Sequence, residues 1–156
     1  MPFRLPKKCR SYFADITGGR DGTKLDTLFD GFYLCALVGL AQGKLDTNAD
    51  LEPGAFVDNY PSDYSESGDY IAGLLISAEA KRQGISPSDA DALERLMTQI
   101  VESQSKTRLS AYGENLLNQY ASRGIDVMIE NLAGHTSLEE FFKDYFECFN
   151  SGAFLN

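Results

Sequence analysis

The sequence predicts an all-α fold, a compact single-domain bundle of about six to seven helices. Apolar residues recur at intervals of three and four along most of the chain, as at Leu116, Leu117 and Tyr120, which is the spacing of one helix face. No alternating run is long enough to indicate a strand. The length of 156 residues, with 43% hydrophobic and 24% charged residues, is typical of one globular domain.

The N-terminal third of the sequence predicts two helices. A short one is expected within residues 7–16, with Phe13 and Ile16 facing inward, followed by a glycine-rich turn over residues 17–23. A longer helix is expected over about residues 25–42. Its centre is apolar nearly all round, which implies burial on several sides. Gly43 is well placed to end it as a left-handed C-cap.

The middle third predicts a connector and two further helices. The connector over residues 44–61 contains proline and glycine, and we expect one turn of helix there, with Phe56 against the core. A helix is expected over about residues 65–83. The next helix is expected to start at Ser86 as N-cap with Pro87 in the first turn, since these residue types favour those positions.

The last third predicts three short helices in close succession. One is expected to end at Gly124 and the next to run over about residues 125–132, because glycine punctuates helical patterns. The last is expected to begin with a capping box, in which Thr136 binds forward and Glu139 reaches back. Residues 151–156 are expected to form a tail.

Charge divides the chain into a basic N-terminal segment over residues 1–24, a helical domain over residues 25–150 and the tail. The net charge is −9, but six basic and two acidic residues give residues 1–24 a charge of +4, which leaves −13 for the rest. An acidic body argues against a broad nucleic-acid surface. The basic segment is either a solvated terminus or a phosphate-binding segment. Its candidate nucleic-acid-binding residues are Arg4, Lys7, Lys8 and Arg10.

The residues able to do chemistry form no recognisable catalytic or metal-binding pattern. The single histidine, His135, is expected to be an exposed turn residue, since no nucleophile is placed beside it. Cys9, Cys35 and Cys148 lie far apart and are expected to be free, mostly buried thiols in a reducing cytoplasm. The acidic residues over 58–69 match no known ligand spacing and read as a solvated helix face. We therefore expect no enzyme activity, no cofactor, no metal and no contact with a membrane.

The last predicted helix carries an aromatic stripe opposite an acidic face. Such a stripe is ordinarily core, but aromatic residues also carry much of the energy of protein interfaces, so both interpretations stay open. The candidate partner-binding residues in this stripe are Phe142, Tyr145, Phe146 and Phe149.

Three segments resemble a known family. Residues 30–43, which end in Val-Gly-Leu-Ala-Gln-Gly, are similar to a helix of small proteins encoded beside DNA phosphorothioation (Dnd-type) and related anti-phage restriction genes. Residues 115–125 resemble the family's Leu-Asn-x-Tyr-Ala-x-Gly segment, and residues 140–145 resemble its closing helix. The resemblance implies a bacterial cytoplasmic accessory subunit with no known chemistry of its own, acting beside larger ATPase and nuclease proteins.

The leading functional prediction is therefore a non-enzymatic accessory or interaction subunit of a bacterial DNA-modification or anti-phage defence complex, with larger subunits of that complex as partners. One alternative is a nucleic-acid-binding module that uses the basic N-terminal segment. Another is an acidic DNA-mimic inhibitor, which ranks last because the acidic residues are dispersed among ordinary helices.

Overall fold

The computed structural model describes residues 2–18, 22–132 and 134–155, and 60% of the chain is helical. The sequence predicts an all-α fold. The structure is mostly helical, but a small antiparallel sheet accompanies the helices, so the fold is not strictly all-α. The described helices and strands are β1 (Phe3–Pro6), α1 (Lys7–Tyr12), α2 (Leu28–Gln42), β2 (Leu51–Val57), α3 (Gly68–Arg82), α4 (Ala90–Ile100), α5 (Ala111–Asn131) and α6 (Leu138–Asn150). Short 3₁₀ turns lie at Ala14–Ile16, Ser62–Tyr64 and Ala153–Leu155.

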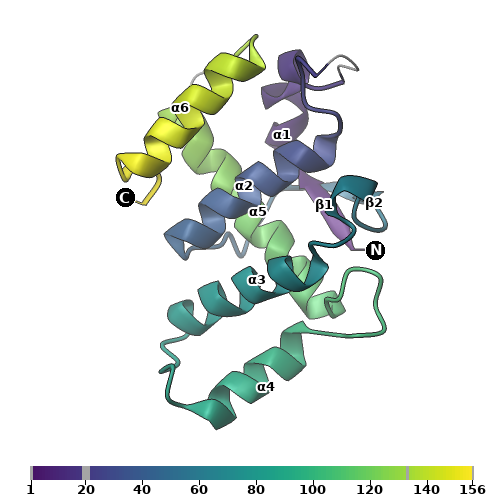
Figure 1. Ribbon diagram of the computed structural model, residues 1–156, viewed down its shortest axis with the longest axis vertical. Coiled ribbons are helices and arrows are strands. Elements are labelled where there is room, and N and C mark those ends of the chain that lie inside the picture. The colour runs from purple at the N-terminus through teal and green to yellow at the C-terminus, as the bar shows by residue number, and fades with distance from the viewer. Residues whose placement is uncertain (1, 19–21, 133, 156) are drawn as a thin grey trace.

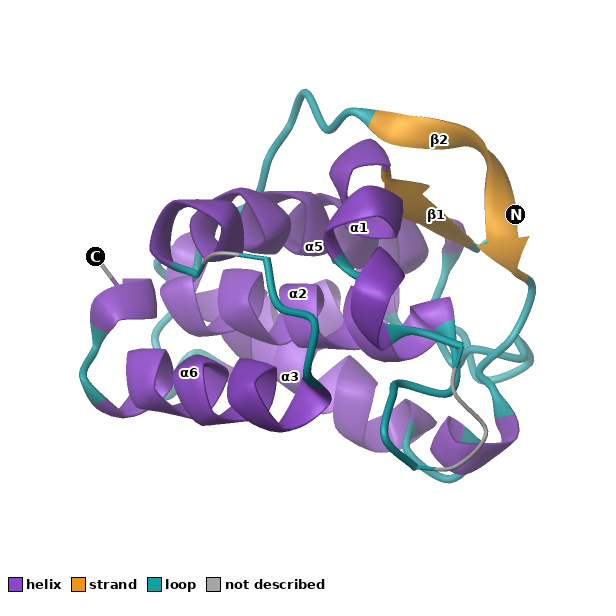
Figure 2. Ribbon diagram, turned by 90° about the horizontal axis from the view of Figure 1, so that it is seen from above, coloured by secondary structure: helices purple, strands orange, loops and turns teal. Residues whose placement is uncertain are grey.

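Helices α2 and α5 cross at the centre of the molecule and make its most extensive contact (Figure 1). Helix α6 lies at one end of the crossing, and the hairpin of α3 and α4 lies at the other. Seen from above, β1 and β2 form one edge, next to α1 (Figure 2). No helix within the described ranges is long and apolar enough to cross a membrane.

Strand β1 directly precedes α1, which lies within the short helix predicted over residues 7–16, whereas β2 lies where the sequence predicts a turn of helix. Phe3 pairs with Val57 and Pro6 with Leu51, and the register shifts between the pairs. The predicted turn of helix in the connector is therefore wrong. Pro53 is tolerated because a two-stranded sheet consists of edge strands, in which a missing N–H need not break a ladder. The predicted glycine turn over residues 17–23 lies partly outside the described residues.

Helix α5 runs without interruption through Gly124, where the sequence predicts a break. A Cβ at this position would collide with the carbonyl oxygen of Cys35 in α2. Glycine is therefore needed for the close approach of two backbones and not for a turn. Gly43, by contrast, ends α2 with a φ of 72° as predicted.

Two helix starts also differ from the prediction. Helix α4 begins after Asp89, whose side chain caps it, and not after Ser86 three residues earlier. Helix α6 is capped by Ser137 and not by Thr136. Both segments contain several residues able to cap, and local periodicity does not choose among them.

Both ends of the chain belong to the same hydrophobic core as the helices. Phe154, in the predicted tail, is fully buried against Tyr145 and Phe149, with ring centroids 5.4 and 5.0 Å away. Described residues near both ends of the chain thus pack against the helices. The buried residues in the described part of the N-terminal segment include Phe3, Leu5, Cys9, Phe13 and Ile16.

Candidate functional site: a groove between α2, α3 and α6

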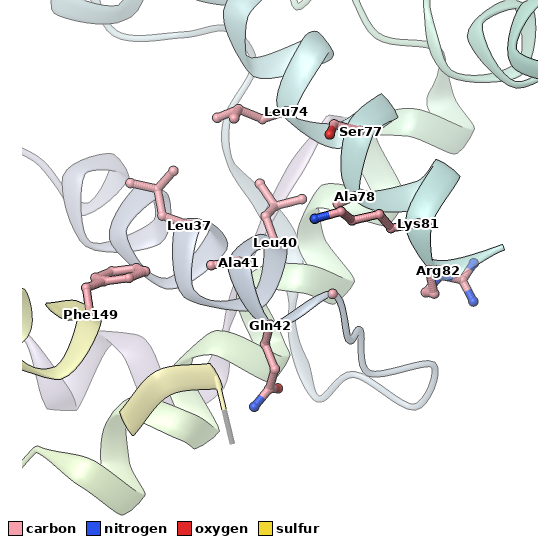
Figure 3. Close-up of a pocket in the computed structure, with 11 residues that line it drawn as sticks. Leu37, Leu40, Ala41, Gln42, Leu74, Ser77, Ala78, Lys81, Arg82 and Phe149 are labelled. Atoms are coloured by element: carbon pink, nitrogen blue, oxygen red, sulfur yellow. The ribbon is translucent and has the colours of Figure 1, made fainter. Parts of the chain in front are cut away.

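An open groove of about 650 Å³ lies between α2, α3 and α6 (Figure 3). Helix α2 supplies Leu37, Leu40 and Ala41, which lie on one face because they are three and four residues apart. Leu74 of α3 lines the opposite wall, and Phe149 of α6 closes one end. The groove is therefore apolar along most of its length.

The apolar lining follows from the unusual composition of α2. Cys35, Val38 and Gly39 on one face are buried against α5. Leu37 and Leu40 on another face stay only half-buried. The sequence predicts burial of α2 on several sides. In the structure the side that faces α5 is buried, whereas the side that carries Leu37 and Leu40 is buried only in part. A leucine side chain contributes about 1.5–3 kcal/mol when fully buried, so this face favours a partner.

The end of the groove next to the C-terminus of α2 is polar and positively charged. Among the described residues, Lys81 and Arg82 are the only charged ones that line the groove, on a chain whose net charge is −9. Lys81 is exposed, and its side chain forms no hydrogen bond or ion pair within the described ranges. Its charge is therefore free to interact with a ligand.

Arg82 is held in place by a buried carboxylate, that of Glu79. The Glu79 side chain is fully buried and accepts hydrogen bonds from Arg82 at 2.8 Å, from Gln83 at 2.9 Å and from the Tyr120 hydroxyl at 3.2 Å. Bonding to Glu79 raises the pKa of Arg82, and burial, followed by the Glu79 charge, raises the pKa of Tyr120. This network neutralises a buried charge and fixes the guanidinium at the groove end. The spacing of apolar residues in the sequence does not predict this network, because the network joins Glu79 of α3 to Tyr120 of α5.

Two further hollows adjoin the groove. A hollow of about 10 Å³ between α2, α3 and α5, lined by aliphatic and aromatic residues, shares Leu37, Leu40 and Leu74 with the groove. On the other side of Gly43 a shallow hollow of about 560 Å³ carries both Arg123 and Asp126 among its charged residues. Neither has the combination of apolar lining and unpaired positive charge that the groove has.

The predicted partner-binding stripe on α6 divides between core and surface. Tyr145 is 1% exposed, and its hydroxyl donates to the Leu34 carbonyl at 2.8 Å, so Tyr145 belongs to the core. Phe149 lines the groove. Phe142 is half-buried and stacks on Phe146, which is 57% exposed. Of the four candidates, Phe142, Phe146 and Phe149 thus remain available to a partner.

The four predicted nucleic-acid-binding residues each contact an acceptor of the chain itself. A phosphate would have to compete with these acceptors, which weakens the counterion release on which such binding depends. Binding of nucleic acid by this segment remains a prediction. The contacts are Lys7 with Asp50 at 2.9 Å, Lys8 with Asp126 at 2.8 Å, Arg10 with Glu52 at 2.9 Å, and Arg4 with the Glu52 carbonyl at 2.8 Å.

His135 is not the exposed turn residue that the sequence predicts. Its side chain is 10% exposed, and Nε2 lies 2.8 Å from a carboxylate oxygen of Asp144. A hollow of about 510 Å³ is lined by His135, Asp144 and Cys148. However, burial, together with the charges of Asp144 and Glu147, raises the pKa of the Cys148 thiol. A nucleophilic cysteine ordinarily has a lowered pKa, so the shift at Cys148 does not support an activated thiol.

No family model, curated protein or solved structure matches this chain. The described part of the chain also brings together no group of three or more His, Cys, Asp or Glu side chains able to hold a metal ion. The groove is thus the surface feature that best indicates a function.

Proposed function

We propose that this protein is a non-enzymatic interaction subunit that binds a larger protein through the groove between α2, α3 and α6. The observation that carries the proposal is the half-buried leucine face of α2, formed by Leu37 and Leu40, which α3 and α6 cover only in part. Exposed apolar surface of this kind is typical of protein-binding sites. The raised pKa of Cys148 and the absence of a base beside another nucleophile in the sequence favour a binding role over a catalytic one.

The resemblance to accessory proteins of DNA phosphorothioation and related restriction systems supports a more specific form of this proposal. The first segment that carries the resemblance, residues 30–43, includes the leucines of the groove. The partner would then be a larger ATPase or nuclease subunit of a bacterial DNA-modification or anti-phage defence complex. Free thiols at Cys9, Cys35 and Cys148 agree with assembly in a reducing cytoplasm.

A tagged pull-down from the native bacterium tests this function, with bound proteins identified by mass spectrometry at low and high salt. Ser77→Arg is the informative variant, because Ser77 is exposed on the α3 wall and a larger side chain blocks the groove without disturbing the core. Gln99→Arg, on the exposed face of α4, is the matched control.

We expect the wild type and Gln99→Arg to retain a stoichiometric ATPase or nuclease subunit at high salt, and Ser77→Arg to lose it. Equal recovery by all three proteins would contradict docking in the groove. Recovery of salt-sensitive nucleic acid alone would instead favour a role for the basic N-terminal segment.

A further inference from the structure

We infer that the occupant of the groove is an amphipathic α-helix of the partner protein with an acidic side chain beside its apolar stripe, and that Lys81 receives this carboxylate. The inference rests on the proposed function and adds the chemistry of the partner to it. Two independent properties of the groove carry it, namely its shape and its distribution of charge.

The shape of the groove suits a helix better than a small apolar molecule. Sites for small ligands usually enclose most of the ligand surface. The groove of about 650 Å³ has helical walls and is open to solvent, so it would leave much of a small ligand exposed. The neighbouring hollow between α2, α3 and α5 adds only about 10 Å³, roughly the volume that one water centre needs. Such a groove accepts apolar side chains from one face of a helix, at positions i, i+3 or i+4, and i+7.

The walls of the groove offer contacts for such a stripe. Leu74, Ser77 and Lys81 are three and four residues apart and therefore follow one line along α3. Leu37 and Leu40 lie on α2 opposite this line. A partner helix placed between α2 and α3 would put its apolar residues against Leu37, Leu40 and Leu74. The turn of that helix that follows its apolar residues would lie beside Lys81.

The charge of the groove selects an acidic side chain at that next turn. Arg82 is already paired with the buried carboxylate of Glu79, whereas Lys81 has no partner in the described chain. In Figure 3 the Lys81 ammonium extends over the groove towards Leu40, while the Arg82 guanidinium points away from it. Lys81 is thus the cation that a ligand in the groove would meet.

The rest of the protein strengthens this selection. With a net charge of −9, most of its surface repels an acidic segment, whereas no acidic residue lines the groove. Complementarity of this kind orients a partner and excludes wrong registers more than it adds affinity. A basic side chain at the same position of the helix would be repelled by Lys81.

A display library of helical peptides tests the inference directly. Each peptide carries leucines at i, i+4 and i+7 and a randomised residue one turn further on. The library is selected against the wild type, against Lys81→Glu and against Lys106→Glu. Lys106 is exposed in the loop between α4 and α5 and lines no described hollow, so its variant controls for the change in net charge. Melting curves of the three proteins establish that each is folded.

We expect the wild type and Lys106→Glu to enrich Asp or Glu at the randomised position, and Lys81→Glu to enrich Lys or Arg. An acidic peptide selected on the wild type should bind Lys81→Glu about tenfold more weakly, as expected for reversal of one partly exposed ion pair. The preference should weaken with added salt.

The same enrichment with Lys81→Glu as with the wild type would overturn the inference, and so would the absence of any enriched peptide. Displacement of all selected peptides by decanoate, or by a second copy of the protein, would also overturn it. These results leave the proposed function standing if Ser77→Arg still abolishes recovery of the partner from the bacterium. If Ser77→Arg retains the partner, the proposed function itself fails.

Discussion

Gly124 of α5 lies against the carbonyl oxygen of Cys35 in α2, with no room for a Cβ between them. One turn along each helix, Gly39 of α2 lies in the same way against the carbonyl oxygen of Tyr120 in α5. The contact is reciprocal, since each glycine is four residues from the backbone that the other glycine touches. The two helices therefore cross with their backbones in contact. This buries one face of α2 and leaves its leucine face turned away from α5.

Gly124→Ala should destabilise the protein by about 3 kcal/mol, because the added methyl group forces the crossing helices apart in a packed core. Gly73→Ala is the matched control, since Gly73 lies inside α3 with open space around its Cα. It should stabilise the protein by roughly 1 kcal/mol through helix propensity alone. Urea unfolding followed by circular dichroism gives both values. Similar effects of the two substitutions would mean that the crossing has more room than the structure shows.

The sequence predicts most of the helices correctly but not the role of these two glycines. Apolar periodicity predicts the helices near 28–42 and 68–82, because these stripes are long and their ends carry recognisable signals. The same reasoning places a break at Gly124, since glycine in an isolated helical pattern reads as punctuation. Only the position of α2 reveals that glycine is required there for close packing.

The groove is likewise only partly predictable. The aromatic stripe that includes Phe149 and the all-round apolar character of α2 are visible in the sequence. The site also needs Lys81, left unpaired, and Glu79, buried against Tyr120. Such pairings depend on which elements meet in space. For the same reason the strand β2, which pairs with the distant N-terminus, is missed.

Arg82→Met should destabilise the protein by about 3 kcal/mol, because it leaves the Glu79 carboxylate buried without its counter-charge. Tyr120→Phe removes one hydrogen bond to the same carboxylate and should cost about 1 kcal/mol. In the double variant Glu79→Gln/Arg82→Met much of the loss should be recovered, since no buried charge remains. Urea unfolding of the wild type, Glu79→Gln, Arg82→Met and the double variant measures the coupling between Glu79 and Arg82. Additive effects in this cycle would contradict a mutually dependent pair.

The ion pair between Arg10 and Glu52 makes a small contribution to acid sensitivity. Hydrogen bonding to Arg10 lowers the pKa of Glu52 below its ordinary value of 4.5. A carboxylate with a lowered pKa in the folded state stabilises the protein above pH 4.5, and this stabilisation is lost as the pH falls through the lowered value. The pair joins β2 to α1 at the surface, so we expect less than about 1 kcal/mol.

The comparison of wild type with Glu52→Gln should therefore show a gap in unfolding free energy at neutral pH that closes on acidification. Gln99→Ala, at an exposed residue of α4, is the control and should show no such change, because neither side chain ionises. A gap that widens as the pH falls would contradict the assigned pair. Chemical unfolding at a series of pH values provides the measurement.

The three cysteines should differ sharply in reactivity. The sulfur atoms of Cys9 and Cys35 lie 3.8 Å apart and are fully buried, and burial raises the pKa of the Cys35 thiol well above its ordinary value. Ellman's reagent cannot reach either buried sulfur, and it reacts only with a thiolate, which the raised pKa of Cys35 disfavours. Neither residue should therefore be labelled in the folded protein at mildly alkaline pH. Cys148 is partly exposed, but its raised pKa should make it react more slowly than a free thiol.

We therefore expect one slowly reacting thiol in the native protein, none in Cys148→Ser, and all of the cysteines to react in urea. Because Cys9 lies in α1 and Cys35 in α2, their protection also reports on how firmly the N-terminal segment is held against the helices. Rapid labelling of native Cys148→Ser would mean that α1 separates readily from α2. In that case the basic residues of α1 would also leave their carboxylate partners, and binding of nucleic acid by this segment would become the better explanation of its charge.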